Sequence, residues 1–354
     1  MAQFYKLTVT DIVKTTRDAV AVTLRAVDAE FPAFLHGQYL TFRRKFEDQE
    51  VRRSYSLCSQ RGAGEIQIGV KKVEDGTFSR WINEDLVVGD TLEALAPMGR
   101  YTTKATDEHA AFLCFAAGSG ITPILSIIRT VLAEKPRARI TLVYANRSPR
   151  SIMFREELEE LKNLHMGRLN IIHILGREST AQDLFVGRID ADKLEKLFST
   201  LIHVPSFDQA LICGPEPLMQ LIAGSLSAAG MDDSQITYEL FGTAQPGRVR
   251  RASTKPSDHA TQQLTQATAT LDGQIHSFSL PRDTSLLEGA IQNDVDPPFA
   301  CRAGVCSTCK AKITDGEVEM VANHALEDYE VERGYVLTCQ CFALSSAVAF
   351  DYDQ

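Results

Sequence analysis

Apolar and polar side chains alternate in short runs over the first hundred residues of the chain. The runs lie at 5–14, 19–27, 38–46, 52–59, 65–73 and 91–98. Alternation with a period of two is typical of strands that bury one face, and turn-rich segments such as 60–65 separate the runs. Residues 75–86 have a helical pattern instead. This part of the chain therefore predicts an antiparallel β-barrel or β-sandwich interrupted by one helix.

From about residue 109 the pattern changes to apolar runs that alternate with amphipathic segments. The strand-like runs lie at 110–118, 140–147, 169–176 and 209–215, and the helical patterns lie at 122–135, 154–165 and 216–230. Buried strands that alternate with helices predict a parallel sheet covered on both faces. This texture is typical of a nucleotide-binding domain.

A polar segment separates this α/β part from the rest of the chain. Residues 243–265 are rich in Pro, Gly, Ser and Thr and show no apolar period, which indicates a linker. The unit that follows begins with a hairpin pattern at 267–281. We therefore predict a multidomain chain with domains at 1–105, 106–242 and 266–354 and a linker at 243–265.

The last domain carries three closely spaced cysteines and a fourth farther along. The spacing is Cys301-x4-Cys306-x2-Cys309, with 29 residues between Cys309 and Cys339. This is the plant-type spacing for a [2Fe-2S] cluster, in which three thiolates lie on one loop. The residues inside the loop are mostly small, which lets backbone N–H groups approach the sulfur atoms of a cluster.

Two other metal centres deserve comparison. A zinc ion could be held by the C-x2-C at 306–309 together with the C-x-C at 339–341, but this leaves Cys301 without a role. A Rieske centre needs two histidine ligands, and neither His276 nor His324 lies in the cysteine loop. The spacing therefore favours the [2Fe-2S] cluster.

Cys341 is a surplus cysteine near the fourth predicted ligand. It follows Cys339 by two residues, so in a strand both side chains would point to the same side. A free buried cysteine behaves as a small hydrophobic residue. We predict Cys339 as the ligand and Cys341 as a core residue.

Two motifs in the first domain suit a flavin nucleotide. Arg53, Tyr55 and Ser56 form R-x-Y-S on a predicted strand, where an arginine can pair with phosphate and a tyrosine can stack on a flavin ring. Gly76 and Ser79 follow as G-x-x-S at a predicted helix start, which favours a pyrophosphate. An ordinary alternating strand and a plain helix cap are the simpler interpretations, and the order of the motifs favours the functional one.

Two strand-to-helix turns in the second domain suit a dinucleotide. In residues 117–123, Gly118 and Gly120 let the backbone approach a ligand, but Pro123 replaces the third glycine of the ordinary Rossmann motif. Cys213 begins a second such turn, C-G-P. It is either a buried core thiol or, at the carboxyl end of a strand, a contact for a nicotinamide.

The four motifs in this order are similar to those of the ferredoxin-NADP reductase superfamily over residues 1–241. The C-x4-C-x2-C module resembles plant-type ferredoxins. The full arrangement resembles the reductase subunits of multicomponent 1,2-phenylacetyl-CoA epoxidases. The resemblance implies an antiparallel β-barrel FAD domain, an α/β parallel-sheet NAD(P) domain and an α+β β-grasp ferredoxin domain.

The resemblance also implies roles for individual residues. It assigns FAD binding to Arg53, Tyr55, Ser56, Gly76 and Ser79, dinucleotide binding to Gly118, Gly120, Thr122 and Cys213, a place near the flavin to Phe241, and iron ligation to Cys301, Cys306, Cys309 and Cys339. Tyr55, Ser56 and Cys213 would lie at the catalytic centre. His36 and Tyr101 replace the proline and phenylalanine that are common in relatives, and neither is expected to touch the chemistry.

Three arginines bear on the choice of nicotinamide. Arg147, Arg177 and Arg188 lie where NADPH-preferring relatives place arginines on the 2′-phosphate. No Asp or Glu closely follows Tyr144 to hold a bare ribose. The resemblance therefore implies NADPH in preference to NADH, although exposed arginines are also common on protein surfaces.

Composition and charge narrow the class of protein and of partner. Of the 354 residues, 44% are hydrophobic and 23% charged, as in globular proteins. Residues 266–354 hold 14 Asp and Glu against 5 Lys and Arg, so the whole net charge of −9 lies there. This excess argues against a nucleic-acid partner and favours docking to a basic protein surface, although an acidic surface kept for solubility is the simpler alternative.

The sequence also predicts where the protein resides. It begins without the pattern of a secretory signal, and Gly118, Gly120 and Pro123 interrupt its longest uncharged stretch, which makes a membrane span improbable. Clustered cysteines in the reducing cytosol mark a metal or redox site more often than disulfides. We expect a cytoplasmic protein.

These features together predict an electron-transfer enzyme. NADPH gives up two electrons as a hydride, an iron–sulfur cluster accepts one, and a flavin between them converts one kind of transfer into the other. By resemblance, the electrons would pass to a partner oxygenase, with a di-iron centre expected. The alternatives are a reductase for a Rieske oxygenase or a hybrid-cluster protein, or a non-catalytic redox sensor.

Overall fold

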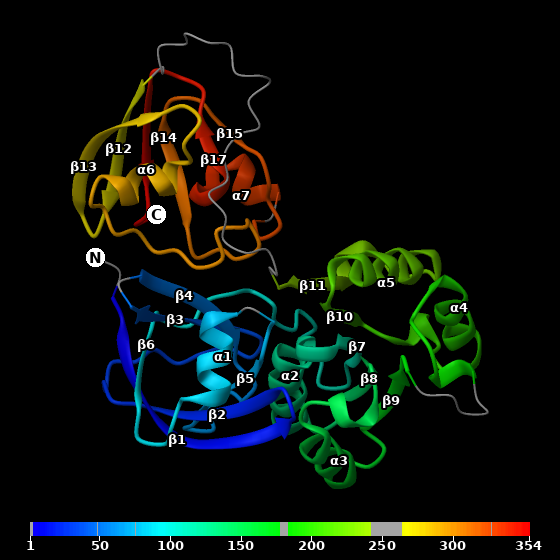
Figure 1. The fold of residues 1–354 in the computed structure, drawn as a ribbon. Coiled ribbons are helices and arrows are strands. Elements are labelled where there is room, and N and C mark those ends of the chain that lie inside the picture. Colours follow the sequence, from blue (N-terminus) through cyan, green and yellow to red (C-terminus); the bar gives the residue numbers. More distant parts are fainter. Residues whose placement is uncertain (1–2, 48, 75, 178–182, 242–263, 327) are drawn as a thin grey trace. The chain divides into compact units, whose positions relative to one another are not determined.

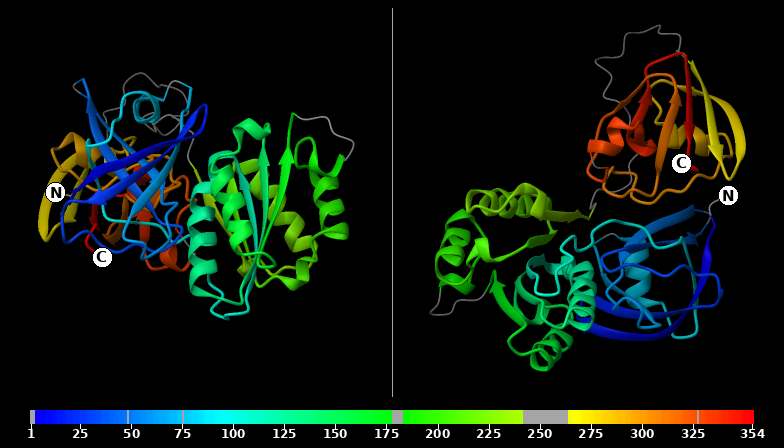
Figure 2. Two further views of the ribbon diagram at one scale, coloured as in Figure 1. Left: turned by 90° about the horizontal axis from the view of Figure 1, so that it is seen from below. Right: turned by 180° about the vertical axis from the view of Figure 1, so that it is seen from behind.

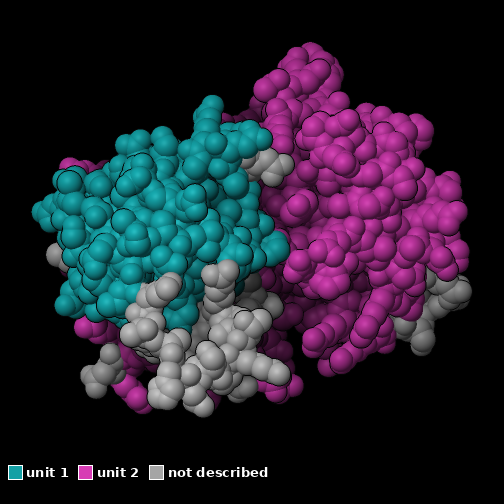
Figure 3. All heavy atoms as spheres, turned by 90° about the horizontal axis from the view of Figure 1, so that it is seen from above, with its two compact units in different colours: residues 1–4, 52–54, 242–354 teal, residues 5–51, 55–241 magenta. Residues whose placement is uncertain are grey.

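The computed structural model divides the chain into two compact units. It describes residues 3–47, 49–74, 76–177, 183–241, 264–326 and 328–354. One unit consists of Met1–Phe4, Arg52–Ser54 and Gly242–Gln354, and the other of Tyr5–Val51 and Tyr55–Phe241; Figure 3 colours them separately. The larger unit holds the dinucleotide motifs and the predicted flavin residues except Arg53, which is grouped with the smaller unit that carries the cysteine loop.

The first hundred residues form a six-stranded antiparallel sheet (Figure 1). Its order is β4 (Gln49–Ser56), β3 (Tyr39–Phe46), β6 (Thr91–Ala94), β1 (Tyr5–Thr16), β2 (Ala19–Ala26) and β5 (Ile66–Lys71). The two outermost strands also meet, because Leu57 after β4 forms a bridge with Ile68 of β5. The Cys58 N–H donates to the Gln67 carbonyl at 2.8 Å beside it. The sheet is therefore closed, and of the barrel and sandwich predicted from the alternation the barrel is confirmed.

One helix packs against the barrel core. Helix α1 (Thr77–Glu84) contributes Phe78, Trp81 and Ile82 to a cluster that also contains Val22, Leu24 and other inward-facing strand residues. The predicted helical interruption at 75–86 is thus present. Because its apolar side is fixed in the barrel, the start of α1 is held next to the strands.

The described residues of 106–241 form a five-stranded parallel sheet covered by helices on both faces (Figure 2). The strand order is β11 (Ile236–Leu240), β10 (Gln209–Gly214), β7 (Ala111–Ala117), β8 (Arg139–Asn146) and β9 (Leu169–Leu175). Helices α2 (Ile121–Glu134) and α3 (Arg155–Leu164) share one apolar cluster with the sheet. Helices α4 (Ala191–Thr200) and α5 (Glu216–Ala228) share another on the opposite face. The predicted α/β domain is confirmed.

A buried glutamine anchors the segment that leads from the barrel into the parallel sheet. Gln209 begins β10 and is 1% exposed. Its Oε1 accepts from the Lys104 N–H at 2.7 Å, and its Nε2 donates to the Thr237 Oγ1 at 3.1 Å and the Thr102 carbonyl at 3.4 Å. One side chain thus joins the connecting segment to two adjacent strands.

The smaller unit has a mixed sheet in the order β13 (Gln274–Pro281), β12 (Leu264–Leu271), β18 (Ala347–Asp351), β14 (Lys310–Asp315) and β16 (Tyr335–Leu337). Strands β15 (Val318–Met320) and β17 (Cys341–Ala343) form a separate pair. Helix α6 (Leu286–Gln292) packs on the main sheet through Leu286 and Ala290, and a short helix α7 (Asp328–Glu332) precedes β16. This sheet with a helix across it is the α+β ferredoxin-type domain expected. Strand β12 begins two residues before the expected boundary at 266.

Some elements carry no clear signal in the sequence. Helix α4 and strand β11 were not predicted, since α4 has only two fully buried residues and β11 is a half-exposed edge strand. Most of the predicted linker, 243–263, lies outside the described residues. No helix in the described part of the chain has the length and apolar character needed to cross a bilayer.

The Gln209 anchor gives a test of the fold. We expect Gln209→Leu to lower the free energy of unfolding by about 2–4 kcal/mol, because the change leaves several buried polar groups without partners. Gln220→Leu, on the exposed side of α5, is the matched control and should change it by less than about 0.5 kcal/mol. Denaturant unfolding checks this expectation, and equal stabilities of the two variants would contradict it.

Candidate functional site

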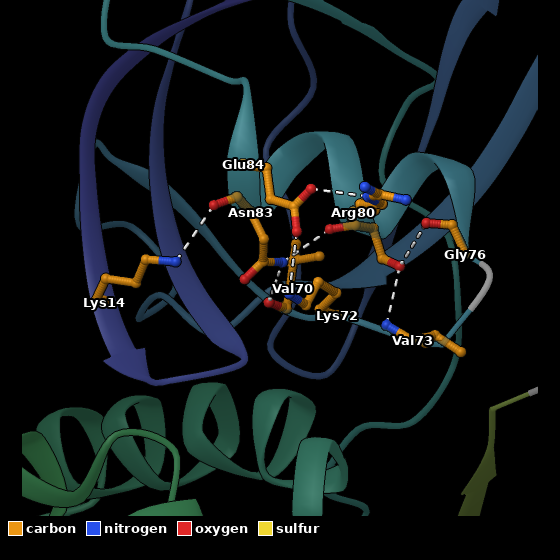
Figure 4. Close-up of polar contacts among 9 residues, drawn as sticks. Lys14, Val70, Lys72, Val73, Gly76, Arg80, Asn83 and Glu84 are labelled. Atoms are coloured by element: carbon orange, nitrogen blue, oxygen red, sulfur yellow. Dashed lines mark hydrogen bonds and ion pairs between the residues drawn. The ribbon is translucent and has the colours of Figure 1, made fainter.

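The start of α1 forms a small polar cradle beside the barrel (Figure 4). The Ser79 Oγ accepts from the Val73 N–H at 3.2 Å and donates to the Gly76 carbonyl at 3.3 Å. A Cβ at Gly76 would lie 2.6 Å from that Oγ, so a larger residue there would displace the Ser79 hydroxyl. Among the described residues no side chain caps α1, which leaves first-turn N–H groups for an anion. The cradle fits the pyrophosphate of a flavin nucleotide.

The rest of α1 is held to the neighbouring strands by polar contacts. The Asn83 amide donates to the carbonyls of Ser79 at 2.8 Å and Val70 at 3.2 Å. Glu84 pairs with Lys72 at 3.1 Å and with Arg80 at 2.8 Å (Figure 4). These contacts fix the direction in which the helix start points.

The R-x-Y-S residues lie on β4 beside this cradle. The Tyr55 ring lies 6.0 Å from Phe78 of α1 and 6.2 Å from Phe42, measured between ring centroids. Ser56 is buried, and the half-buried Arg53 donates to the preceding carbonyl at 2.7 Å. The structure therefore brings Tyr55 of the first predicted flavin motif next to Phe78, which lies between Gly76 and Ser79 of the second.

The two glycine turns of the parallel sheet touch each other. A Cβ at Gly120 would overlap the carbonyl of Cys213, and a Cβ at Gly214 would lie 2.9 Å from that of Ala117. Gly118 has φ +55, in the left-handed region that favours glycine. Strands β7 and β10 are adjacent and parallel, so both turns lie at the same edge of the sheet. This edge, with little side-chain bulk, fits a dinucleotide phosphate.

Thr122, Cys213 and Phe241 lie around the same edge. The Thr122 Oγ1 donates to the Ser119 carbonyl at 3.0 Å, and its side chain is buried. Burial raises the pKa of the Cys213 thiol well above its usual value, so this thiol stays protonated at neutral pH. Phe241 packs against the core cluster that contains Cys213. These three predicted residues are thus brought together.

Two residues at this edge were missed by the sequence analysis. Glu239 of β11 is paired in register with Cys213, and burial raises the pKa of its carboxyl to about 8. The Nζ of Lys71 in β5 would lie 3.6 Å from a Cβ built at Gly118. The pKa of the Lys71 amine is lowered, first by burial and then by the charge of Arg147. A carboxyl that holds a proton near neutral pH and a nearby amine suit proton and phosphate chemistry.

Tyr101 lies closer to this edge than expected. It is 2% exposed, and its hydroxyl has no hydrogen-bond partner within the described part of the chain. Burial raises the pKa of this hydroxyl, and the neighbouring Cys213 and Glu239 act in the same direction. The only sequence feature that could have indicated the buried group of Tyr101, Cys213 and Glu239 is a charged residue, Glu239, within an otherwise apolar run.

The three predicted arginines follow neighbouring strand ends. The Arg177 N–H donates to the Arg147 carbonyl at 2.9 Å, which places the ends of β8 and β9 together. Arg188 follows Val186, which bridges Leu175 of β9. All three side chains are exposed, and within the described ranges none forms an ion pair. This arrangement leaves three guanidinium groups for a phosphate.

The four predicted cysteine ligands form two pairs. A hydrogen bond with Cys306 is the largest cause that lowers the pKa of Cys301, to about 6, and backbone N–H groups of the loop add to it. Likewise, a hydrogen bond with Cys309 is the largest cause that lowers the pKa of Cys339. A two-iron cluster needs this arrangement, because each iron takes two thiolates. The described residues hold no group of three or more potential ligands around a single ion.

The second pair is fixed by contacts between the loop and a later segment. The Thr338 N–H and Oγ1 donate to the Cys309 carbonyl at 3.1 and 2.9 Å. Cys339 follows in the short helix Thr338–Gln340. Cys341 lies on β17, fully buried in the main core cluster of the unit, and burial raises the pKa of its thiol to about 12. The cysteine set therefore fits a [2Fe-2S] cluster without Cys341.

Family models match all three parts of the chain. An oxidoreductase FAD-binding domain matches residues 6–103, an oxidoreductase NAD-binding domain matches 115–224, and a 2Fe-2S iron-sulfur cluster binding domain matches 269–344. The chain is therefore an oxidoreductase with a flavin domain, a nicotinamide domain and an iron–sulfur domain.

Full-length relatives define the family more narrowly. The chain is 40% identical to a subunit of 1,2-phenylacetyl-CoA epoxidase from Escherichia coli, over 100% of this chain and 99% of the relative. It is 34% identical to the ferredoxin reductase component of 3-ketosteroid-9-alpha-monooxygenase from Mycobacterium tuberculosis, over 99% and 96%. Phthalate dioxygenase reductase, a solved structure, aligns with a TM-score of 0.62 at 25% identity over 98% of both chains. The chain belongs to the ferredoxin reductase family that includes this epoxidase component.

The cysteine pairs give a test that separates Cys339 from Cys341. We expect Cys339→Ser to lose most of the bound iron and its visible absorption, because one iron then lacks a thiolate. Cys341→Ser should keep both, with a loss of stability of about 1–3 kcal/mol from the buried hydroxyl. Iron analysis and absorption spectra of the purified proteins check this, and the opposite pattern would make Cys341 the ligand.

Proposed function

We propose that this chain supplies electrons from NADPH to a partner oxygenase, and that the partner is the oxygenase of a phenylacetyl-CoA epoxidase. The observation that carries the proposal is the match, end to end at 40% identity, to a protein named as a component of that epoxidase. Other relatives, matched over at least 90% of this chain, are also named as reductase components of monooxygenases. A di-iron centre in the partner is part of the same proposal.

The proposal assigns a role to each candidate site. A flavin held by these residues would supply the conversion between two-electron transfer from NADPH and one-electron transfer to a [2Fe-2S] cluster. The FAD contacts are Arg53, Tyr55, Ser56, Gly76 and Ser79, the dinucleotide contacts are Gly118, Gly120, Thr122 and Cys213, with Phe241 next to the flavin, and the iron ligands are Cys301, Cys306, Cys309 and Cys339. The protonated carboxyl of Glu239 supports a polar, proton-holding environment next to Cys213.

Location and docking follow from composition. We propose a cytoplasmic protein, because its eight cysteines are all free in the structure, as in a reducing compartment. The acidic residues of 266–354 support docking to a basic surface on the oxygenase, with neither nucleic acid nor membrane as partner.

The three arginines make the nicotinamide preference testable. We expect Arg147→Ala combined with Arg177→Ala to raise the KM for NADPH about 10- to 100-fold, since each guanidinium would lose a charge-assisted bond to the 2′-phosphate. The KM for NADH should change by less than about twofold. Steady-state kinetics with ferricyanide as acceptor measures both.

The control for this test is Arg137→Ala, which removes an exposed arginine paired with Glu108 at the other end of β8. It should leave both KM values unchanged. Equal losses with NADPH and NADH in the double variant would show that the arginines do not read the 2′-phosphate.

The acceptor is tested by reconstitution. The purified chain with NADPH, oxygen, phenylacetyl-CoA and the epoxidase oxygenase should form epoxide, with NADPH consumed in step with product. Rates should fall as salt is added, because the expected docking is electrostatic. Product formation only with a Rieske oxygenase or a hybrid-cluster protein as acceptor would contradict the proposal. Epoxidation by this chain alone would do so as well.

A further inference from the structure

A buried glutamine follows the fourth predicted iron ligand directly. Gln340 ends the short helix Thr338–Gln340 that carries Cys339, and it is 4% exposed. A buried amide needs hydrogen-bond partners, since leaving them unmade costs about 1–3 kcal/mol. Its contacts therefore indicate what the side chain is for.

The amide of Gln340 joins the two cysteine-bearing segments. Its Nε2 donates to the carbonyl of Arg302, 38 residues earlier in the three-cysteine loop, at 3.0 Å. The same nitrogen donates to the Cys339 carbonyl at 3.1 Å and approaches the Cys339 Sγ at 3.6 Å, within reach of a sulfur acceptor. One amide thus contacts both the three-cysteine loop and the sulfur of Cys339, the predicted ligand that lies outside this loop.

The loop is shaped to admit this side chain. Gly304 has φ +74, and a Cβ there would lie 3.0 Å from the Gln340 Cγ and 3.1 Å from the Ala322 carbonyl oxygen. Arg302, two residues earlier, also has a positive φ of 53. The turn that exposes the Arg302 carbonyl to Gln340 therefore depends on a glycine next to the amide.

Neighbouring polar residues do not account for the amide. Thr338 fixes the helix to Cys309 through its own hydroxyl and N–H, and the Tyr352 hydroxyl in turn donates to Thr338 at 3.1 Å. The segment is thus already attached on the Cys309 side. Gln340 supplies the contact on the Arg302 side and the only side-chain amide at a predicted ligand sulfur among the described residues.

We propose that Gln340 is a positioning residue for the [2Fe-2S] cluster, which ties Cys339 to the three-cysteine loop and raises the reduction potential through an N–H···S bond. Hydrogen bonds to ligand sulfur stabilise the added negative charge of the reduced state, so they favour uptake of the electron. This inference rests on the iron–sulfur part of the proposed function.

Gln340→Met and Gln340→Glu test the proposal in the full-length, cluster-loaded chain. Methionine has similar length and no donor, and glutamate adds a negative charge near the sulfur. At the wild-type midpoint potential, the ratio of reduced to oxidised cluster should fall about tenfold in Gln340→Met, or about 59 mV for one electron. In Gln340→Glu this ratio should fall further than in Gln340→Met. Redox titration followed by electron paramagnetic resonance measures the shift.

Gln274→Met is the matched control, because Gln274 is exposed at the start of β13 in the same unit. It should leave the midpoint unchanged. A Gln340→Met midpoint equal to that of the wild type and of Gln274→Met would overturn the proposal. A polypeptide that binds no iron at all would instead overturn the proposed function.

A measurement on the wild-type chain covers the case in which the variants fail to fold. Protein labelled with ¹⁵N only in glutamine side chains should show a ¹⁵N hyperfine coupling from one amide nitrogen to the reduced cluster. Electron-nuclear double resonance detects such a coupling. Its absence in the labelled protein, with the cluster signal intact, would overturn the proposal.

Discussion

At each candidate site a glycine lets the backbone lie so close to another part of the chain that a β-carbon would clash. A Cβ at Gly76 would meet the Ser79 hydroxyl, one at Gly120 would overlap the Cys213 carbonyl, and one at Gly304 would press on Gln340. Phosphate and cluster sulfide both carry negative charge that backbone N–H groups stabilise at close range. The candidate sites therefore share close backbone packing at a glycine, although their folds differ.

The scaffold meets this requirement in three ways. In the barrel domain, the apolar side of α1 is buried, so the helix start is presented beside Tyr55. In the parallel sheet, adjacent strands end at the same edge, so two turns meet there. In the ferredoxin-type unit, Thr338 fixes a distant segment to the end of the cysteine loop. The strands and helices form a rigid scaffold, and the candidate binding residues lie mostly in the short segments next to them.

The buried edge around Cys213 shows how environment rather than residue type sets the chemistry. A cysteine is a strong nucleophile only as a thiolate, and burial keeps this thiol protonated. The same burial keeps the neighbouring Glu239 carboxyl protonated up to a pKa of about 8. In the cysteine loop, hydrogen bonds within each pair act unequally: they lower the pKa of Cys301 and of Cys339, and they raise the pKa of their partners Cys306 and Cys309.

Local pattern in the sequence was enough to predict an all-β part, an α/β part and a further cysteine-bearing unit, most strands and helices, and the four candidate cysteine ligands, because periodicity and spacing are properties of neighbouring residues. The pairing of Glu239 with Cys213, and the contact of Gln340 with Arg302, were decided only by the tertiary structure. The first depends on strand order and the second on how a loop closes over a later helix. Both contacts join residues that are far apart in the chain, so no local sequence pattern predicts them.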